Sequence, residues 1–344
     1  MDTEKALNEN NFMGNYGGSY SAYYALVEAT TGKRVERKVQ AIHRNPILVP
    51  KNRDWERICS FNPYGMTSTV PTISSTKTTM TVPELLPLLE RDGTIVRSDG
   101  AIACHKIAIE PVWNLAKLSQ RLRVDESHLR KTLNRYFPDP KLLDPKVRVF
   151  LPPIEGSTVY CFGDIERYYQ EKSETKQSMK VVSRVHDECN GSDTFGSHIC
   201  SCRPYLVYSI EEAVRYAQNG NLGIVVYNRK EGRALGEVIK FLVYNGRKNQ
   251  PGGDRAETYF HHTEAFTNVR DARFQQLMPD VLLWLGIRKV DLWMSMSNEK
   301  SDALKDLGIE ISEQREIPQR MLPKESQIEV VAKIASGYFS ETTQ

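Results

Sequence analysis

The sequence predicts an α+β protein built of α/β layers, and three observations support that prediction. Runs typical of buried strands alternate with helix-like runs between residues 158 and 294, and such alternation builds helices onto a sheet. A proline-rich stretch, PDPKLLDPKVRVFLPP at 138–153, divides the chain. The length of 344 residues suits two domains, each with its own core. We therefore expect a C-terminal domain with a mixed sheet and flanking helices, preceded by a mixed α/β N-terminal domain.

The expected organisation has four parts. Residues 1–20 are rich in Asn, Gly and Ser and predict a mobile tail. An N-terminal accessory domain is expected over 21–144, the main domain over 145–325, and a C-terminal helix or tail over 326–344. Within the accessory domain, four prolines between residues 45 and 79 predict extended or irregular chain.

Three elements are expected in the rest of the N-terminal region. Thr81–Arg91 predicts a helix with Thr81 as its N-cap and Pro83 in the first turn. Alternation over Gly93–Ile109 predicts strand, with a turn at Ser98-Asp99-Gly100. Leucines at helical spacing over Asn114–Phe137 predict two short helices with a break near Val124-Asp125.

The helical pair carries five basic residues, which allows two interpretations. A helix-turn-helix would place a recognition helix in the major groove of DNA. The other interpretation is an amphipathic pair whose basic side is solvated, and we favour it because the signal is short and no second half-site is marked. The five residues are Arg121, Arg123, Arg130, Lys131 and Arg135.

The main domain shows the clearest alternation. Strands are expected at Thr158–Phe162, Val181–Val185, Leu222–Tyr227 and Val290–Met294, and helices at Ile210–Gln218 and Ala234–Tyr244, with a helix end at Leu282–Leu285. LGIVVY at 222–227 is a continuous apolar run, as expected of a strand buried on both faces.

Composition excludes several classes of protein. Lys and Arg number 46 against 43 Asp and Glu, and a net charge of +3 does not mark a general nucleic-acid or membrane binder. No apolar run approaches the 18 or more residues that would span a bilayer. Six cysteines, three of them clustered, favour a reducing compartment over a disulfide framework. The N-terminus lacks the apolar core of a signal peptide, so we expect a cytoplasmic protein.

Those three cysteines are Cys189, Cys200 and Cys202, in a C-x10-C-x-C arrangement. Three soft donors on a short connection suit a tetrahedral Zn²⁺ whose fourth position stays open, as in catalytic sites. The alternative is three buried cysteines that only pack. We favour zinc because two cysteines separated by one residue rarely need each other for packing.

Residues 145–320 resemble the GTP cyclohydrolase II family. RVHDEC at 184–189, FGSHICSC at 195–202, NRKEGRALG at 228–236 and Lys240 match that family's motifs in order. The resemblance implies that the three cysteines bind one zinc ion and that the metal's water opens a nucleobase ring. It also implies a homodimer.

The resemblance assigns further residues. Asp271 is implied as a proton acceptor, Arg273 as the residue that attacks the α-phosphate, and Glu231 as a partner for an N–H of the base. Alone, Glu231 equally fits a helix N-terminus where an acid complements the dipole. The expected substrate contacts are Arg184, His186, Glu188, Tyr205, Lys230, Arg233, Arg255, Ser295 and Lys300.

Departures from the family pattern concern the substrate. Tyr205 and Lys230 stand where the family keeps glutamine, and of the family's T-N-N-P-x-K segment only a hydroxyl and a lysine remain, Ser295 and Lys300. Such changes should cost guanine binding severely. The pattern resembles the branch of the family found in uracil catabolism. We therefore expect hydrolytic opening of the uracil ring of a uridine nucleotide, UMP first, with Tyr205 stacking on the base or donating to it.

Two alternatives remain open. One is a true GTP cyclohydrolase II of riboflavin biosynthesis. The other is a nucleotide-sensing regulator that binds DNA through residues 114–137. Five histidines have no assigned role: His105, His128, His198, His261 and His262.

Overall fold

The computed structural model describes residues 30–32, 56–60, 72–136, 138–151, 156–173, 179–233, 236–268 and 271–341. The tail predicted at 1–20 lies outside these residues, as does most of the irregular stretch predicted for 45–79. Contacts group the described chain into two compact units. Unit 1 takes residues up to 75, 107–157 and 279–286, and unit 2 takes 76–106, 158–278 and 287 onward.

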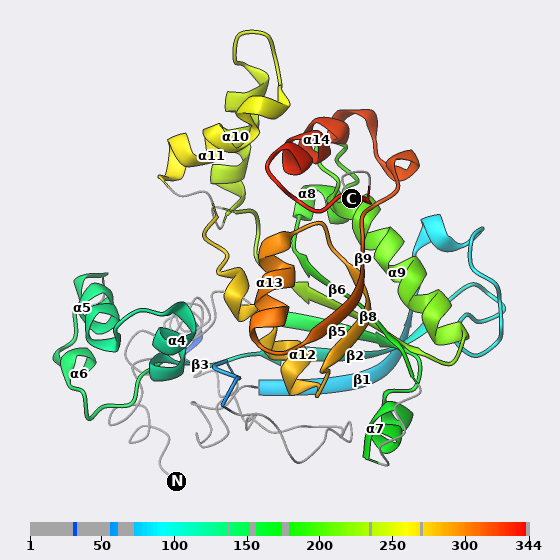
Figure 1. Cartoon of the computed structure of the whole chain (residues 1–344), viewed down its shortest axis with the longest axis horizontal. Helices are drawn as coiled ribbons and strands as arrows, with labels where there is room; N and C mark the ends of the chain where they lie inside the picture. The colour runs from blue at the N-terminus through cyan, green and yellow to red at the C-terminus, as the bar shows by residue number, and fades with distance from the viewer. Residues whose placement is uncertain are drawn as a thin grey trace. The chain divides into compact units, whose positions relative to one another are not determined.

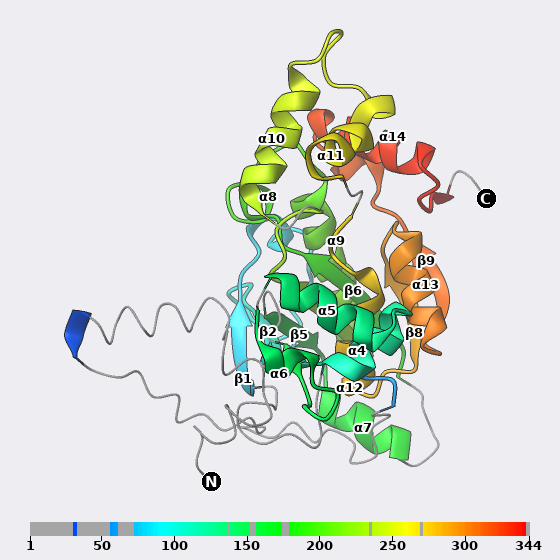
Figure 2. The same ribbon diagram turned by 90° about the vertical axis from the view of Figure 1, so that its left-hand side faces the viewer.

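Unit 1 is mainly helical (Figure 2). Its elements are α4 (Leu115–Leu122), α5 (Glu126–Tyr136), α6 (Pro140–Leu143), α12 (Asp280–Trp284) and the two-stranded pair β3 (Trp113–Asn114) and β4 (Phe150–Leu151). The side chain of Asn114 caps α4 by accepting from the N–H of Lys117, and α4 ends at Arg123, whose φ is +56°. The predicted pair of helices is confirmed, and the gap between α4 and α5 contains the predicted break at Val124-Asp125.

Two of the basic residues predicted to line a solvated surface are internal instead. Arg121 lies 2.8 Å from Asp280, whose side chain is 2% exposed. Arg130 donates to the carboxylate of Glu126 and to the carbonyls of Leu142 and Val147. Their charges hold unit 1 together, so they are not available to a DNA backbone, which counts against the DNA-binding alternative.

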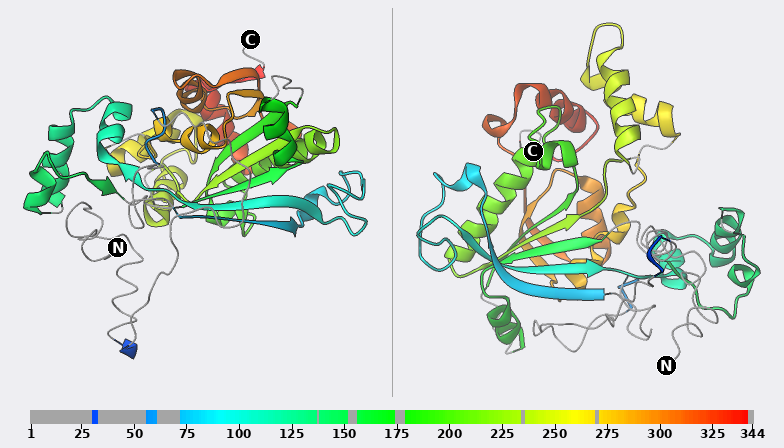
Figure 3. Two further views of the ribbon diagram at one scale, coloured as in Figure 1. Left: turned by 90° about the horizontal axis from the view of Figure 1, so that it is seen from below. Right: turned by 180° about the vertical axis from the view of Figure 1, so that it is seen from behind.

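A seven-stranded sheet has the order β1-β2-β5-β7-β6-β8-β9, and Figure 3 shows its strands side by side. The strands are β1 (Thr72–Met80), β2 (Ile102–Glu110), β5 (Ser157–Phe162), β6 (Val181–Asp187), β7 (Leu222–Asn228), β8 (Lys289–Met294) and β9 (Glu310–Arg315). β6 is parallel to β7 and β8, and β8 is parallel to β9. The fold class is confirmed, as are the strands predicted at β5, β6, β7 and β8. β2 covers only the second half of the strand predicted at Gly93–Ile109, and β1 and β9 were not predicted.

The other helices of the described residues belong to unit 2. They are α7 (Ile165–Ser173), α8 (Asn190–Asp193), α9 (Cys202–Gln218), α10 (Glu237–Lys248), α11 (Tyr259–Thr267), α13 (Asn298–Asp306) and α14 (Gln327–Ala335). The same unit contains the short 3₁₀ turns η2 (Pro83–Leu85), η3 (Ala256–Thr258), η4 (Gln275–Leu277), η5 (Gln319–Met321) and η6 (Lys324–Ser326). α9 lies along one face of the sheet (Figure 1). Its residues Ile210 and Val214 share a buried apolar core with Val182 and Val225 of the strands.

Two helix predictions need correction. The helix predicted at Thr81–Arg91 is only the short turn η2, capped at Val82. Pro87 explains this, because it has no N–H to donate and its ring clashes with the carbonyl four residues earlier. The helix predicted at 210–218 begins at Cys202. Pro204 is compatible with that start because the first helical turn leaves its N–H groups without intrahelical acceptors.

The parallel register places the ends of three strands together. Asp187, the last residue of β6, aligns with Asn228, the last residue of β7, and the paired β8 ends at Met294. Ligands of α/β sheets bind beyond the carboxyl ends of parallel strands. The segments that follow these strands contain Cys189, Glu231 and Ser295, which are the residues that the sequence singled out.

Candidate active site

The structure brings the three clustered cysteines together. Cys189 caps α8, Cys200 lies in the turn that follows, and Cys202 begins α9. Their sulfur atoms all lie within 4.8 Å of one another, and those of Cys189 and Cys200 are 3.5 Å apart. In the part of the chain that the structure describes, no other group of His, Cys, Asp or Glu is arranged to hold a metal ion.

These donors fit a zinc ion. Three thiolates at short range are the soft ligands that Zn²⁺ prefers, and a fourth position stays open. Hydrogen bonding to Cys189, together with burial, raises the pKa of the Cys200 thiol to about 12. A cation must therefore displace protons when it binds, so its affinity should increase with pH.

Lys240 of α10 contacts this cluster. Its Nζ donates to Sγ of Cys189 at 2.8 Å and forms an ion pair with the carboxylate of Glu231. Glu231 also accepts from the N–H of Asn190 at 2.8 Å. Burial by itself lowers the pKa of Lys240, but the neighbouring Cys189 and Cys202 outweigh it and raise that pKa. The sequence marked Lys240 only as part of a motif. The sequence feature that could have identified Lys240 as a site residue is its position near the start of the helix that follows Glu231.

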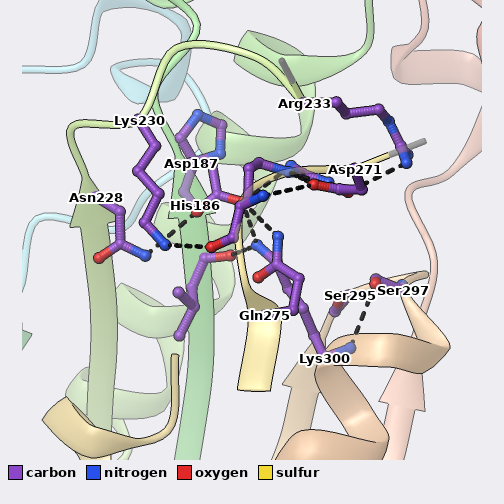
Figure 4. Close-up of polar contacts among 12 residues, drawn as sticks. His186, Asp187, Asn228, Lys230, Arg233, Asp271, Gln275, Ser295, Ser297 and Lys300 are labelled. Carbon is purple, nitrogen blue, oxygen red and sulfur yellow. Dashed lines mark hydrogen bonds and ion pairs between the residues drawn. The ribbon is translucent and has the colours of Figure 1, made fainter. Parts of the chain in front are cut away.

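Asp187 is the centre of a second group of charges. Its carboxylate contacts Arg273 (2.9 Å), Lys300 (3.0 Å), Gln275 (3.0 Å) and Asn228 (3.2 Å). Figure 4 shows Lys300, Gln275 and Asn228 around Asp187. Burial alone would raise the pKa of Asp187, but Lys300 and Arg273 hold it well below the usual range. Asp187 and Gln275 were not among the predicted site residues, although Asp187 ends the strand that leads to Cys189.

Lys300 lies in the same group and titrates abnormally. Burial lowers its pKa from the ordinary 10.5 to about 8, with Arg273 and Arg184 adding to the effect and Asp187 opposing it. One carboxylate cannot balance all the cations around it. Between pH 8 and 10.5 the unfolded chain therefore binds more protons at Lys300 than the folded chain does.

This shift predicts a pH dependence of stability. The free energy of unfolding of the wild type, relative to that of Lys300→Met, should rise by about 2–3 kcal/mol from pH 8 to pH 10.5. Urea unfolding of both proteins at the two pH values measures the difference. Lys305→Met, an exposed lysine of the same helix, should follow the wild type. A constant difference between wild type and Lys300→Met would contradict the shift.

Arg233, Asp271 and Arg273 form a linked set. The carboxylate of Asp271 pairs with Arg273 at 2.5 Å and with Arg233 at 3.2 Å. Burial raises the pKa of Asp271, but the hydrogen bonds and charge of Arg273 lower it overall. The carboxylate is therefore a weak base. Arg273 is held between Asp271 and Asp187, and Lys230 donates to its backbone carbonyl at 2.9 Å.

Tyr205 is placed differently from the expectation that it would donate to a base. Its hydroxyl donates to the carbonyl of Arg315 at 2.5 Å. The guanidinium of Arg184 lies 3.9 Å from the centre of its ring. The hydroxyl is thus already used as a donor, and one ring face is covered by a cation.

Arg184 and His186 point toward the same region from β6. Arg184 donates to the carbonyl of Met294 at 2.9 Å and shares a hydrogen bond of 3.1 Å with Nδ1 of His186. Nε2 of His186 lies 2.9 Å from the carboxylate of Asp193. Burial lowers the pKa of His186 in spite of Asp193, and this favours a neutral ring. In the described chain, Nε of Arg184 is buried without a hydrogen-bond partner.

The remaining predicted contacts divide into two groups. Glu188 and Ser295 line the cavity next to the cysteines. Burial, and to a smaller extent repulsion from Glu231, raises the pKa of Glu188. Arg255 is exposed and lies away from the cavity lining, as do the five unassigned histidines: His105, His128, His198, His261 and His262.

A cavity of about 180 Å³ joins these groups. Its lining contains the three cysteines and three carboxylates, Asp187, Glu188 and Glu329. The cations in the lining are Arg184, Arg233, Lys240, Arg247, Arg273, Lys300 and Lys333. Cations are in excess, so the cavity suits an anionic ligand.

A cation-rich cavity at the carboxyl ends of parallel strands, with three thiols at its wall, is the kind of site in which an enzyme binds an anionic ligand such as a nucleotide. The chain belongs to the GTP cyclohydrolase II family. That family's profile, described as "GTP cyclohydrolase II", matches residues 155–316, and a profile described as "GTP cyclohydrolase N terminal" matches residues 1–136. The N-terminal match was not anticipated from the sequence.

Several known proteins are similar to this chain. "Putative GTP cyclohydrolase URC1" of Lachancea kluyveri is 45% identical over 98% of this chain and 80% of its own length. "Uracil-regulated protein 1" of Schizosaccharomyces pombe is 46% identical over 98% of this chain and 81% of its own. "GTP cyclohydrolase-2" of Neisseria meningitidis is 36% identical over 39% of this chain and 62% of its own. No helix in the described residues combines the length and hydropathy needed to cross a membrane.

Proposed function

We propose that this protein hydrolyses the uracil ring of a uridine nucleotide, with UMP as the substrate. The observation that carries the choice of base is Tyr205. Its hydroxyl is bonded to the carbonyl of Arg315 and its ring is covered by Arg184. Tyr205 stands where the family keeps a glutamine, so at that position the edge of guanine would meet no side-chain amide.

Two further observations support the proposal. The lining contains more cations than carboxylates, which suits the phosphate of a nucleotide. A relative that shares 46% identity over 98% of this chain is named as regulated by uracil. We also propose a cytoplasmic homodimer, as the family resemblance implies.

In the proposed reaction the oxygen of water bonds to a ring carbonyl carbon, the ring C–N bond breaks, and the nitrogen takes a proton. Cys189, Cys200 and Cys202 would hold a zinc ion, which supplies Lewis-acid activation of water and of the attacked carbonyl. Glu231 is the acid that we propose for proton transfer, as the resemblance implies, and Lys240 links its carboxylate to Cys189. Asp271 is less suited, since two arginines neutralise its carboxylate.

Arg273 is proposed as a phosphate anchor. A monophosphate has no pyrophosphate to release, so the nucleophilic role implied by the resemblance has no substrate bond to act on. Asp187 and Asp271 fix the guanidinium from two sides and keep it charged. A fixed, charged guanidinium is suited to hold a phosphate by two parallel hydrogen bonds.

The test compares UMP with GTP. Purified zinc-loaded protein is incubated with each nucleotide, and the loss of base absorbance in the ultraviolet is followed. We expect loss of the uracil absorbance and no change with GTP. Turnover of GTP alone would refute the proposal and return the protein to the riboflavin-type reaction.

A further inference from the structure

The C-terminal segment from Leu322 to Glu341 contributes part of the cavity wall. Glu329, Lys333 and Tyr338 from this segment line the cavity. All three lie beyond residue 316, where the match to the family profile ends. The wall therefore contains side chains from outside the stretch that matches the family profile.

Packing fixes this segment in unit 2. Val330 and Ala332 of α14 are buried, and Val330 belongs to the apolar core that includes Tyr205 and Ile210. The N–H of Phe339 donates to the carbonyl of Met296 at 2.9 Å. Because these contacts flank the cavity residues on both sides, their side chains are held in place.

Glu329 links the segment to the cysteine cluster. Glu329 is 5% exposed. Its carboxylate accepts from the N–H of Ser201 at 2.8 Å and pairs with Lys333 at 2.5 Å. Ser201 lies between Cys200 and Cys202 at the start of α9, where a carboxylate complements the helix dipole. Glu329 thus connects the segment to the residues between Cys200 and Cys202, and Tyr338 contributes a side chain to the cavity wall.

Tyr338 contacts Arg233, one of the expected substrate contacts and one of the cations of the cavity lining. Nη2 of Arg233 donates to the Tyr338 hydroxyl at 2.7 Å, while Nη1 lies 3.2 Å from Asp271. The guanidinium carbon is 4.6 Å from the ring centre of Phe260 and 5.7 Å from that of Tyr338. Two hydrogen bonds and two aromatic rings therefore define the plane of this guanidinium.

We propose that Tyr338 is a positioning residue, which orients Arg233 to bind the phosphate of a nucleoside monophosphate. A guanidinium carries five N–H donors, and two are used by Asp271 and Tyr338, so the others remain for a phosphate. An arginine that is held in one plane loses less conformational entropy when it forms a bidentate bond. The C-terminal segment is in this way a determinant of nucleotide affinity. The inference rests on the proposed function for the identity of the nucleotide.

The test is Tyr338→Phe, which keeps the ring and removes only the hydroxyl. We expect KM for UMP to rise about tenfold, as for the loss of one hydrogen bond to a charged group, while kcat stays within about twofold. Val331→Ala is the control, because Val331 is 55% exposed on α14 and does not line the cavity. It should leave KM unchanged, and the thermal midpoints of both variants should match the wild type.

A double-mutant cycle separates positioning from a purely structural role. If Tyr338 acts through Arg233, then adding Tyr338→Phe to Arg233→Gln should raise KM no further than Arg233→Gln alone. An equal effect of Tyr338→Phe in both backgrounds, or an unchanged KM in the single variant, would overturn the inference. Calorimetric binding of UMP gives the same comparison without turnover.

Assays of the wild type and Tyr338→Phe with both UMP and GTP distinguish the proposed function from the positioning role of Tyr338. If the wild type acts on GTP and not on UMP, the proposed function fails. A tenfold rise in KM for GTP in Tyr338→Phe would still support the positioning role. If the wild type opens UMP and Tyr338→Phe has the wild-type KM, the positioning role fails and the proposed function stands.

Discussion

Replacing Cys200 by alanine should remove the metal ion and reduce ring opening at least about a thousandfold. The substitution leaves two sulfur ligands, and two donors cannot form the three-ligand site that catalytic zinc requires. The loss is large because the ion supplies the Lewis-acid activation on which the proposed reaction depends. Metal content measured by mass spectrometry should fall from about one ion per chain to none. With the same protein, the ultraviolet absorbance of UMP should no longer decrease.

Cys104→Ala is the matched control for this prediction. Cys104 in β2 is 6% exposed and Cys200 is 3% exposed, so both variants lose a buried thiol. Cys104 does not belong to the cysteine cluster. The control should keep its metal ion and its activity. A Cys200→Ala protein that retained one ion per chain and full turnover would show that the cluster is not the metal site.

Replacing Asp187 by asparagine should destabilise the protein by about 3–5 kcal/mol, the cost of removing one partner from a buried ion pair. The side chain of Asp187 is 5% exposed, and those of its partners Arg273 and Lys300 are 15% and 9% exposed. Without the carboxylate, these two cations repel each other in a region that water cannot screen. Urea unfolding at pH 7 measures the change, read as a lower midpoint at constant slope.

An exposed ion pair provides the comparison for Asp187→Asn. The carboxylate of Glu313 lies 2.6 Å from Arg315, but its side chain is 54% exposed. Glu313→Gln should therefore change the free energy of unfolding by less than about 1 kcal/mol. Equal effects of the two substitutions would show that Asp187 does not hold the cations as the structure describes.

Local sequence patterns predicted most of the sheet of unit 2. Continuous apolar runs such as LGIVVY at 222–227 have few alternatives to a buried strand, and β7 covers that run. Patterns failed where one residue type had two meanings. Pro83 fits the first turn of the helix predicted at Thr81–Arg91, yet Pro87 stops that helix after η2, and the helix predicted at 210–218 begins earlier, at Cys202, with Pro204 in its first turn.

The site could be predicted only where chemistry follows from spacing along the chain. Cys189, Cys200 and Cys202 are close in sequence, and the ten residues between the first two bring the sulfur atoms together. Lys240 and Glu329 could not be assigned in this way. Lys240 reaches Cys189 from 51 positions away, and Glu329 reaches the N–H of Ser201 from 128 positions away.

The sequence by itself determined the strands, the three thiols and the charged residues at the strand ends, because each follows from local periodicity or short spacing. The tertiary structure alone decided which charges pair. Asp187 meets Arg273 and Lys300 only because parallel strands end at one edge of the sheet. Tyr205 faces Arg184, and Tyr338 contacts Arg233, only through packing between distant segments. Ion pairs and hydrogen bonds depend on distances of a few ångströms in space, which the order of residues along a chain does not encode.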